Sequence, residues 1–313
     1  MCEIRLLFPV HMRTFFQDDT WQSGLEEIRV RVGQPIEFCY GSDNCYLIGK
    51  EKEQMFCSEK DYRRWEKDLY HASEADLREM LNYISNYSLY AYKEEIKQGY
   101  ITIEGGHRVG VAGQTVLVDG KIAGISPITF LNIRIAHEKC GCAKKILPLI
   151  RQKNSIYNTL ILSMPGAGKT TLLRDSIRAL SNGEAYGIRL KVCVVDERSE
   201  IAGCFRGQPQ NDVGLRTDVL DACPKALGIP ILLRSANPQV IAVDEITVRE
   251  DLMAMSAAAN CGVRFLATIH AADRRELGRR PLFSHLLKEK VFEKLVTIRR
   301  EEGQRQYLVE ELW

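Results

Sequence analysis

The alternation of apolar and polar residues divides the chain into two regions. In residues 1–150, stretches such as 27–32 and 100–104 carry apolar side chains at every second position, which is typical of strands with one buried face. Further strands are predicted at 36–40, 108–118 and 121–125, the last two joined by a hairpin turn at Asp119-Gly120. Amphipathic stretches predict helices within 59–70, 73–85 and 89–98. This region therefore predicts an α+β domain.

Residues 151–313 alternate short apolar runs with helical stretches. Runs that are apolar at every position indicate strands buried on both faces, and helices between them indicate βαβ units. The predicted strands lie at 159–162, 191–195, 229–233, 240–243 and 263–269, and helices are expected from Lys169 and over 247–260. We expect an α/β domain on a parallel sheet at 151–313, separated from the α+β domain at 1–150 by a polar interruption near residue 151.

Composition narrows the possible function classes. The 313 residues include 43 Lys and Arg against 41 Asp and Glu, a near-balance that argues against a protein that coats nucleic acid. No apolar run approaches the roughly 18 residues that span a bilayer, and the start lacks a signal-peptide pattern. We expect a cytoplasmic protein that reaches membranes through partners. Without an export signal its ten cysteines are not expected to form disulfides, and Cys140 and Cys142 lack the spacing and the second pair of a zinc site.

The stretch Ser163-Met-Pro-Gly-Ala-Gly-Lys-Thr-Thr171 has the pattern of a phosphate-binding loop. It follows an apolar strand and opens a helix, which is the context of a P-loop (Walker A motif). Its glycines let backbone N–H groups surround a phosphate, Lys169 is expected to reach the β- and γ-phosphates, and the Thr170 hydroxyl is expected to ligate Mg²⁺. The predicted nucleotide-binding residues are Ser163, Pro165, Gly166, Ala167, Gly168, Lys169, Thr170 and Thr171. Ser163 departs from the glycine that usually begins the motif.

Polar side chains end three other predicted strands. Asp244 and Glu245 follow residues 240–243, where Asp244 is expected to hold Mg²⁺ and Glu245 to polarise the attacking water as a general base. Glu197, at the end of another strand, is a rival for that catalytic role. His270 ends a further strand and is expected to sense the γ-phosphate. A helix cap at Asp244-Glu245 and a structural role for His270 stay open as alternatives.

Arginines beside these motifs are candidates for a contact across a subunit interface. In ring ATPases, a guanidinium supplied by a neighbour neutralises charge in the transition state. The candidates are Arg216, Arg234 and Arg249.

Taken together, the motifs resemble the type II/IV secretion ATPase superfamily. Its pattern of a P-loop, an acidic box, a second acidic motif and a His box matches residues 163–171, 195–200, 240–245 and 262–270. In that superfamily the acidic-box glutamate usually has the catalytic role, which favours Glu197. Pilus-type members typically carry Gly-Glu where this chain has Asp244-Glu245, a departure that makes this site more like an ordinary P-loop ATPase.

A closer resemblance is to the stage III sporulation protein AA family, over residues 26–33, 132–136, 195–203, 212–225 and 243–246. It implies a cytosolic ATPase of endospore formers, with a C-terminal RecA/AAA-like P-loop ATPase domain that follows the N-terminal α+β domain in sequence. It also implies a homo-hexamer with ATP between domains and neighbours, where Arg108 or Arg134 would reach the nucleotide. The ring would dock, on the mother-cell side, on membrane-embedded proteins of a channel complex around the forespore.

The resulting hypothesis is Mg²⁺-dependent ATP hydrolysis by a ring motor that energises this channel complex. Three alternatives stay open. The basic run 274–280 would suit a nucleic-acid-dependent motor, although such runs are usually solvated helix faces, so nucleic acid is the less expected partner. A small-molecule kinase would need an acceptor pocket, and a nucleotide switch would bind without turnover.

Overall fold

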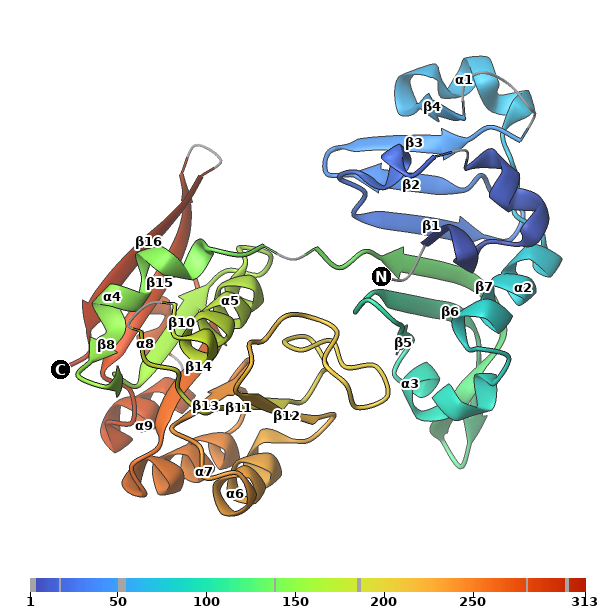
Figure 1. Ribbon diagram of the computed structural model, residues 1–313. Coiled ribbons are helices and arrows are strands. Elements are labelled where there is room, and N and C mark those ends of the chain that lie inside the picture. Colours follow the sequence, from blue (N-terminus) through green and yellow to red (C-terminus); the bar gives the residue numbers. More distant parts are fainter. Residues whose placement is uncertain are drawn as a thin grey trace. The chain divides into compact units, whose positions relative to one another are not determined.

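The computed structural model describes residues 4–16, 18–49, 55–137, 139–184, 187–279, 281–301 and 304–313. The chain divides into two units, Met1–His137 and Glu138–Trp313 (Figure 1). The residues just before 151, grouped with the first domain by their sequence pattern, lie in the second unit. There, Ala143 of a 3-10 helix, Cys142–Lys145, and Leu147 and Ile150 of α4 (Leu147–Ile150) lie in the same core as α5 (Lys169–Asn182).

The first unit is an antiparallel sheet in the order β4-β3-β2-β1-β7-β6-β5. Its strands are β1 (Glu27–Arg31), β2 (Glu37–Tyr40), β3 (Asp43–Leu47), β4 (Phe56–Ser58), β5 (Tyr100–Thr102), β6 (Arg108–Val118) and β7 (Lys121–Arg134). Its helices are α1 (Tyr62–Trp65), α2 (Glu74–Ile84) and α3 (Lys93–Lys97). Short 3-10 helices lie at Ile4–Leu7, Val10–Phe15, Thr20–Gln22, Glu59–Asp61, Glu66–Asp68 and Leu89–Tyr92.

Alternating side chains of this sheet build the core of the first unit. Ile28 and Val30 of β1 are fully buried, as the alternation predicts. The N-terminal 3-10 segments add an aromatic cluster in which the ring centroids of Phe8 and Phe16 lie 4.8 Å apart and Phe38 meets Trp21 edge-on. The 3-10 segments that precede β1 are thus part of the core of this unit.

The second unit contains a seven-stranded sheet in the order β12-β11-β13-β14-β10-β15-β16. The strands are β10 (Thr159–Ser163), β11 (Val192–Asp196), β12 (Thr217–Asp221), β13 (Val240–Val243), β14 (Arg264–His270), β15 (Lys294–Glu301) and β16 (Gln304–Glu311). The neighbours pair in parallel except β15 with β16, which pair antiparallel. A separate pair joins β8 (Arg151–Gln152) and β9 (Ser155–Ile156). The helices besides α4 and α5 are α6 (Lys225–Ser235), α7 (Arg249–Asn260), α8 (Arg274–Gly278) and α9 (Pro281–Glu289).

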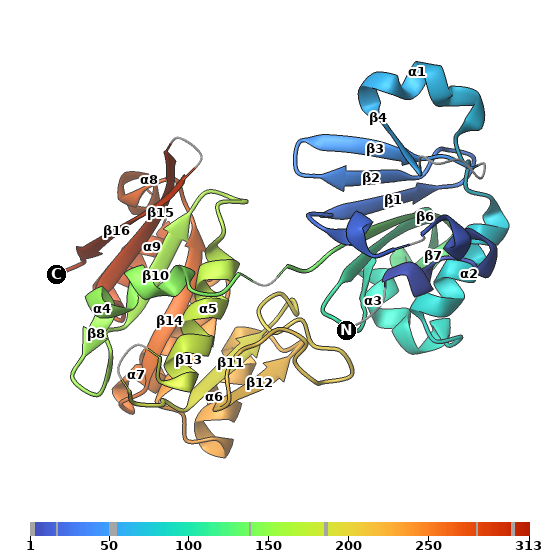
Figure 2. The same ribbon diagram turned by 45° about the horizontal axis from the view of Figure 1, so that its top comes forward.

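Both faces of this sheet are buried, which explains the wholly apolar strands. Along β11, Val192 and Val194 belong to the core that includes α5, whereas Cys193 and Val195 belong to the core that includes α6 and α7. Figures 1 and 2 show helices on the two faces. The predicted α/β fold with a parallel sheet is therefore confirmed for this unit.

One predicted strand is wrong, because Ile229–Leu233 lies within helix α6. An apolar run of this length fits either structure, and here the buried side chains Ile229 and Leu232 follow helical i, i+3 spacing. Pro230 also argues against a central strand, since it has no N–H for the ladder. The edge position of the sheet belongs instead to β12, whose acidic residues hide its strand pattern.

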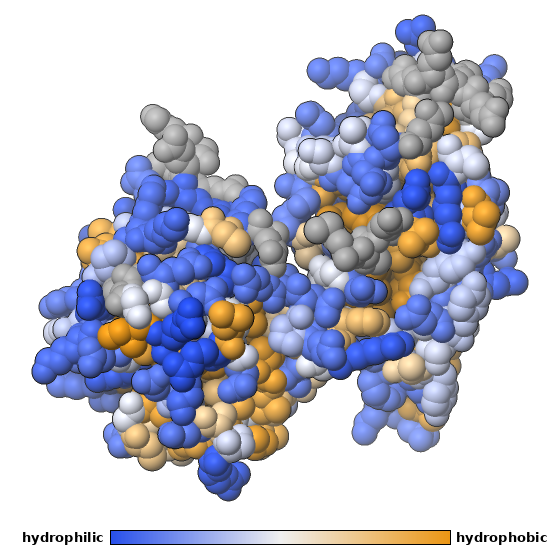
Figure 3. Space-filling model, viewed as in Figure 1, coloured by the Kyte–Doolittle hydropathy of each residue, from blue (hydrophilic) through white to orange (hydrophobic). Residues whose placement is uncertain are grey.

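Apolar side chains reach the surface of the second unit over α6 and α7 (Figure 3). Leu227, Ile231 and Met253 are exposed there. Within the described residues, no helix has the length and apolar character needed to cross a bilayer. Every cysteine that the structure describes is a free thiol, and Cys2 lies outside these residues.

We expect Gly228→Ala to destabilise the protein by about 1–3 kcal/mol, the usual range for overpacking a core. A Cβ at this position in α6 would lie 2.6 Å from Cγ1 of buried Val195. Gly278→Ala is the matched control in α8, where a Cβ meets no atom within 4 Å, and it should change stability by less than about 1 kcal/mol. Urea unfolding of both variants measures this, and equal stabilities would contradict the packing of α6 on β11.

Candidate functional site

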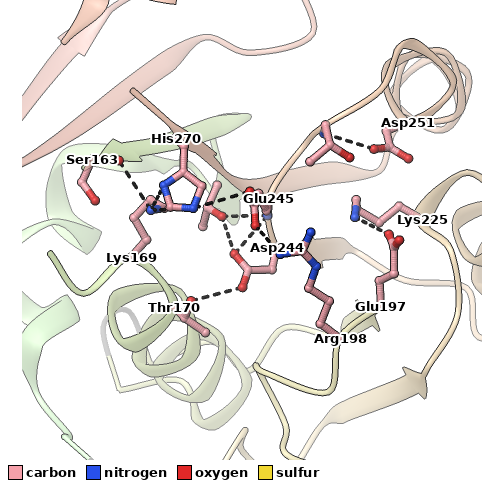
Figure 4. Close-up of polar contacts among 12 residues, drawn as sticks. Ser163, Lys169, Thr170, Glu197, Arg198, Lys225, Asp244, Glu245, Asp251 and His270 are labelled. Carbon is pink, nitrogen blue, oxygen red and sulfur yellow. Dashed lines mark hydrogen bonds and ion pairs between the residues drawn. The ribbon is translucent and has the colours of Figure 1, made fainter. Parts of the chain in front are cut away.

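The parallel register brings the ends of several strands to one edge of the sheet. Val195 lies opposite Val243, Val243 opposite Ala267, and Ser163 opposite His270. The residues that follow these positions therefore meet at the carboxyl edge, where open α/β sheets bind ligands. Figure 4 shows the side chains that gather there.

The predicted P-loop joins β10 to α5 in a conformation that needs glycine. Gly166 and Gly168 have φ angles of 73° and 98°, in the left-handed region. Gly168 is the N-cap of α5, so the backbone N–H groups of the first turn point out of the helix end. A Cβ on Gly166 would meet no atom within 4 Å, so the surface of the loop is open there. The loop fits an anion.

The other predicted loop residues differ in exposure. Ser163 is fully buried, and its hydroxyl donates to the carbonyl oxygen of Met164 at 2.9 Å. Pro165 is exposed, while Ala167 packs on the core beneath α5. Thr171 is half-buried in the first turn of the helix. The serine at the first position is thus accommodated by a local hydrogen bond.

Lys169 is a buried cation at the centre of the site. Its side chain crosses to β14, where Nζ lies 2.7 Å from Nδ1 of His270 and 3.4 Å from the carbonyl oxygen of Ser163. The residue is 6% exposed. Burial lowers the pKa of its ammonium, and the carboxylates of Asp244 and Glu245 oppose this shift.

Asp244 is held by hydroxyl groups from two elements. Thr170 Oγ1 donates to its Oδ2 at 3.1 Å, and the hydroxyl of buried Thr268 on β14 donates to Oδ1. A carboxylate beside a hydroxyl is the donor chemistry that Mg²⁺ accepts, with phosphate oxygens and water completing its shell. Among the described residues, no group of three His, Cys, Asp or Glu side chains that could hold a metal ion is found.

Glu245 lies between His270 and an arginine from the next motif. Its Oε1 is 3.5 Å from His270 Nε2, and Arg198 donates to its Oε2 at 2.9 Å. Its φ angle of 38° is in the left-handed region, which costs a non-glycine residue energy. Its backbone N–H donates to Thr268 Oγ1 at 2.8 Å, so its position depends on β14.

Glu197 points elsewhere. It forms an ion pair with Lys225 at the start of α6, a residue that is 4% exposed. Figure 4 shows Glu197 directed toward Lys225, whereas Glu245 is directed toward His270. The two candidate bases therefore have separate partners.

Hydrogen bonds to Asp196 and from Arg174 hold the loop that carries Glu197 and Arg198. Buried Asp196 accepts hydrogen bonds from the backbone N–H groups of Glu200, Ile201 and Ala202 at 2.8–3.0 Å. Arg174 of α5 donates to the carbonyl oxygens of Glu200 and Ile201. Burial raises the pKa of Asp196 to about 6, although the three hydrogen bonds oppose the rise.

The structure brings together most of the predicted site residues and adds others. Lys225 and Arg174 were missed, because a lysine or arginine inside a helix has no local pattern that marks its distant partner. Lys225 does close the 212–225 stretch that supported the family resemblance.

The candidate interface arginines Arg216, Arg234 and Arg249 are exposed. Arg216 donates to the carbonyl oxygen of Arg189, and Arg234 to that of Pro230. Their interface role, and those of Arg108 and Arg134 in the first unit, stay predictions.

The architecture is similar to that of two solved ATPase structures. The X-ray structure of the Legionella pneumophila ATPase DotB matches with a TM-score of 0.60 and 17% identity, over 96% of this chain and 80% of that chain. The pilus retraction motor PilT with bound ADP matches with a TM-score of 0.55 and 14% identity, over 92% of this chain and 79% of that chain. The chain has the fold of the RecA-like secretion ATPases.

Sequence comparison identifies the family. The family model of sporulation stage III, protein AA matches residues 2–308. Stage III sporulation protein AA of Bacillus subtilis (strain 168) is 39% identical over 305 residues, covering 97% of this chain and 92% of that protein. An uncharacterized protein, ycf45 of Cyanidium caldarium, is 29% identical over 164 residues, 51% of this chain and 46% of its own. The chain belongs to the sporulation stage III, protein AA family, which confirms the family resemblance.

The raised pKa of Asp196 predicts a pH dependence of stability. The folded state binds this proton more tightly than the unfolded state, so the contribution is fully present below about pH 4 and is lost as pH rises through about 6. The free energy of unfolding of the wild type should therefore fall by about 2–3 kcal/mol more than that of Asp196→Asn between these values. Urea unfolding of both proteins across this range tests it; parallel pH profiles would contradict the prediction.

Proposed function

We propose that the second unit binds ATP with Mg²⁺ and hydrolyses it. The observation that carries this proposal is the meeting of the P-loop with two polar strand ends: Lys169 Nζ lies 2.7 Å from His270 Nδ1, and Thr170 Oγ1 lies 3.1 Å from Asp244 Oδ2. This arrangement gives a phosphate cradle, a cation and a metal-binding pair within one cluster. The likeness of the fold to structures named as ATPases supports the proposal.

Each residue of the cluster has a distinct role in this proposal. The P-loop backbone around Gly166 and Gly168 binds the phosphates, and Lys169 leaves His270 to contact their terminal oxygens. Thr170 and Asp244 hold Mg²⁺, which when bound neutralises charge on the phosphate oxygens. His270 then senses whether a γ-phosphate engages the lysine.

We propose Glu245, rather than Glu197, as the residue that polarises the attacking water. The sequence resemblance favours Glu197, and both carboxylates are ion-paired, but Glu197 pairs with buried Lys225 whereas Glu245 pairs with exposed Arg198. Glu245 is 3.5 Å from His270, the side chain that touches Lys169, and is therefore the carboxylate nearer to the phosphate cradle. Arg198 would have to release Glu245 before the Glu245 carboxylate accepts a proton from water.

At the level of the assembly, we propose a homo-hexameric motor that docks on membrane-embedded proteins of the channel between mother cell and forespore. The family resemblance supports this role, and the exposed aliphatic residues of α6 support contact with another chain, because exposed apolar patches mark interaction sites. The nucleic-acid motor has less support. Arg274 of the basic run donates to the carbonyl oxygens of Glu311 and Leu312, and Arg280 lies outside the described residues.

Lys169→Ala should lower ATP turnover at least about a hundred-fold, because it removes the cation that neutralises developing charge on the phosphates. Phosphate release with MgATP is the measurement. Lys288→Ala, at an exposed position of α9, is the control and should retain wild-type turnover. Full activity of Lys169→Ala in a folded protein would refute the assignment of the site.

The two glutamates are separated by comparing Glu245→Gln with Glu197→Gln. Loss of a general base costs about 10²–10⁴ in rate, so Glu245→Gln should lower kcat by at least about a hundred-fold with little change in ATP affinity. Glu197→Gln should cost less than about ten-fold. The opposite ranking in single-turnover measurements would return the catalytic role to the acidic box.

A further inference from the structure

A guanidinium from the far end of the chain lies against the P-loop. A Cβ built on Gly168 would be 2.7 Å from Cζ and Nη2 of Arg305 and 3.1 Å from its Nε. These three atoms belong to the flat face of the guanidinium, so this group covers the Cα of the last loop glycine. The left-handed backbone of Gly168 requires glycine, and the missing Cβ leaves the space that the guanidinium occupies.

The position of Arg305 follows from the sheet. The residue is on β16, which pairs with β15, and β15 runs parallel to β10, the strand that leads into the P-loop. Tyr307, two residues along and therefore on the same face of the strand, packs on the core beneath α5. Figure 1 shows the β15–β16 hairpin beside β10. Arg305 is therefore supplied by a regular strand.

The pKa shifts of two neighbouring side chains agree with this position of Arg305. Burial raises the pKa of the Cys142 thiol to about 12, and the nearby Arg305 guanidinium opposes this rise. Burial likewise raises the pKa of Tyr307, and Arg305 again acts in the opposite direction. Cys142 contacts the carbonyl oxygen of Thr171 in the first turn of α5, so the charge of Arg305 lies at the beginning of this helix.

Positive charge gathers on the P-loop side of this helix end. The N-terminus of a helix carries partial positive charge, and Lys169 adds a full charge in the same turn. In the described part of the chain, none of the ion pairs of this unit involves Arg305. Three positive contributions thus converge on one loop, an arrangement that a polyphosphate would neutralise.

We propose that Arg305 is a phosphate-binding residue of the nucleotide site, contributed by the C-terminal hairpin of the same chain. The planar guanidinium presents N–H donors that suit phosphate oxygens, on the Gly168 side of the loop. The ligand is the phosphate chain of a nucleoside di- or triphosphate. This inference rests on the proposed nucleotide binding and adds a second cation to Lys169.

The test compares Arg305→Gln, which removes the charge but keeps a polar side chain beside Tyr307, with Arg305→Lys and Arg305→Ala. Calorimetric titration gives Kd values for MgATP, MgADP and inorganic pyrophosphate, and thermal unfolding confirms that each variant is folded. Arg305→Gln should weaken all three ligands about ten-fold to a hundred-fold, the range for a lost hydrogen bond to a charged group. Arg305→Lys should recover part of the loss.

Arg299→Ala is the matched control, because Arg299 is an exposed arginine on the partner strand of the same hairpin. It should bind all three ligands like the wild type. An equal loss in this control would show a general charge effect and overturn the assignment.

The remaining outcomes separate this inference from the proposed function. Wild-type affinity, or tighter binding, in folded Arg305→Gln would overturn the role of Arg305 while leaving the nucleotide site intact. Weaker ATP binding with unchanged pyrophosphate binding would assign the guanidinium to the nucleoside and overturn the phosphate contact. Absence of ATP and pyrophosphate binding in the folded wild type would refute the proposed function, and this inference with it.

Discussion

The register of the parallel strands is the constraint on which the site depends. Because β11, β13, β14 and β10 are neighbours in that order and end at the same edge, residues far apart in sequence, such as Ser163 and His270, become adjacent. A shift of one residue in any of these strands would turn its side chains to the opposite face. The apolar side chains of both cores resist such a shift, so core packing also determines the geometry of the cluster around Lys169.

Charge compensation explains the arrangement of the side chains at the site. Lys169 is buried next to His270, and its ammonium is stabilised by the nearby Asp244 and Glu245. The two candidate bases, Glu197 and Glu245, are each paired with a cation. A phosphate group would compete for these cations and so redistribute the contacts of the whole cluster. These ion pairs would thus link phosphate binding to the freedom of Glu245.

Sequence patterns predicted the parts of this fold that depend on local chemistry. Strands buried on both faces must be apolar, and a P-loop must contain glycine, lysine and a hydroxyl, so 159–162, 240–243 and Lys169 were identifiable. The helix at 225–235 was missed because its apolar run suits either secondary structure.

Contacts made over long separations were not predictable in the same way. Lys225 with Glu197, and Arg305 with Gly168, depend on strand order and on the direction of side chains. Glu197 and Glu245 both end apolar strands, so spacing does not rank them; their different partners appear in three dimensions. The roles assigned to these residues remain proposals.

Arg174 gives the P-loop helix a second task. It lies one turn beyond Lys169 and Thr170 and is bonded to the carbonyl oxygens of Glu200 and Ile201. Because a helix is stiff over such a short length, these two bonds couple the orientation of α5 to the position of the loop that carries Arg198. Arg198 in turn donates to Glu245, so a chain of hydrogen bonds connects the helix that begins at the loop glycines with this carboxylate.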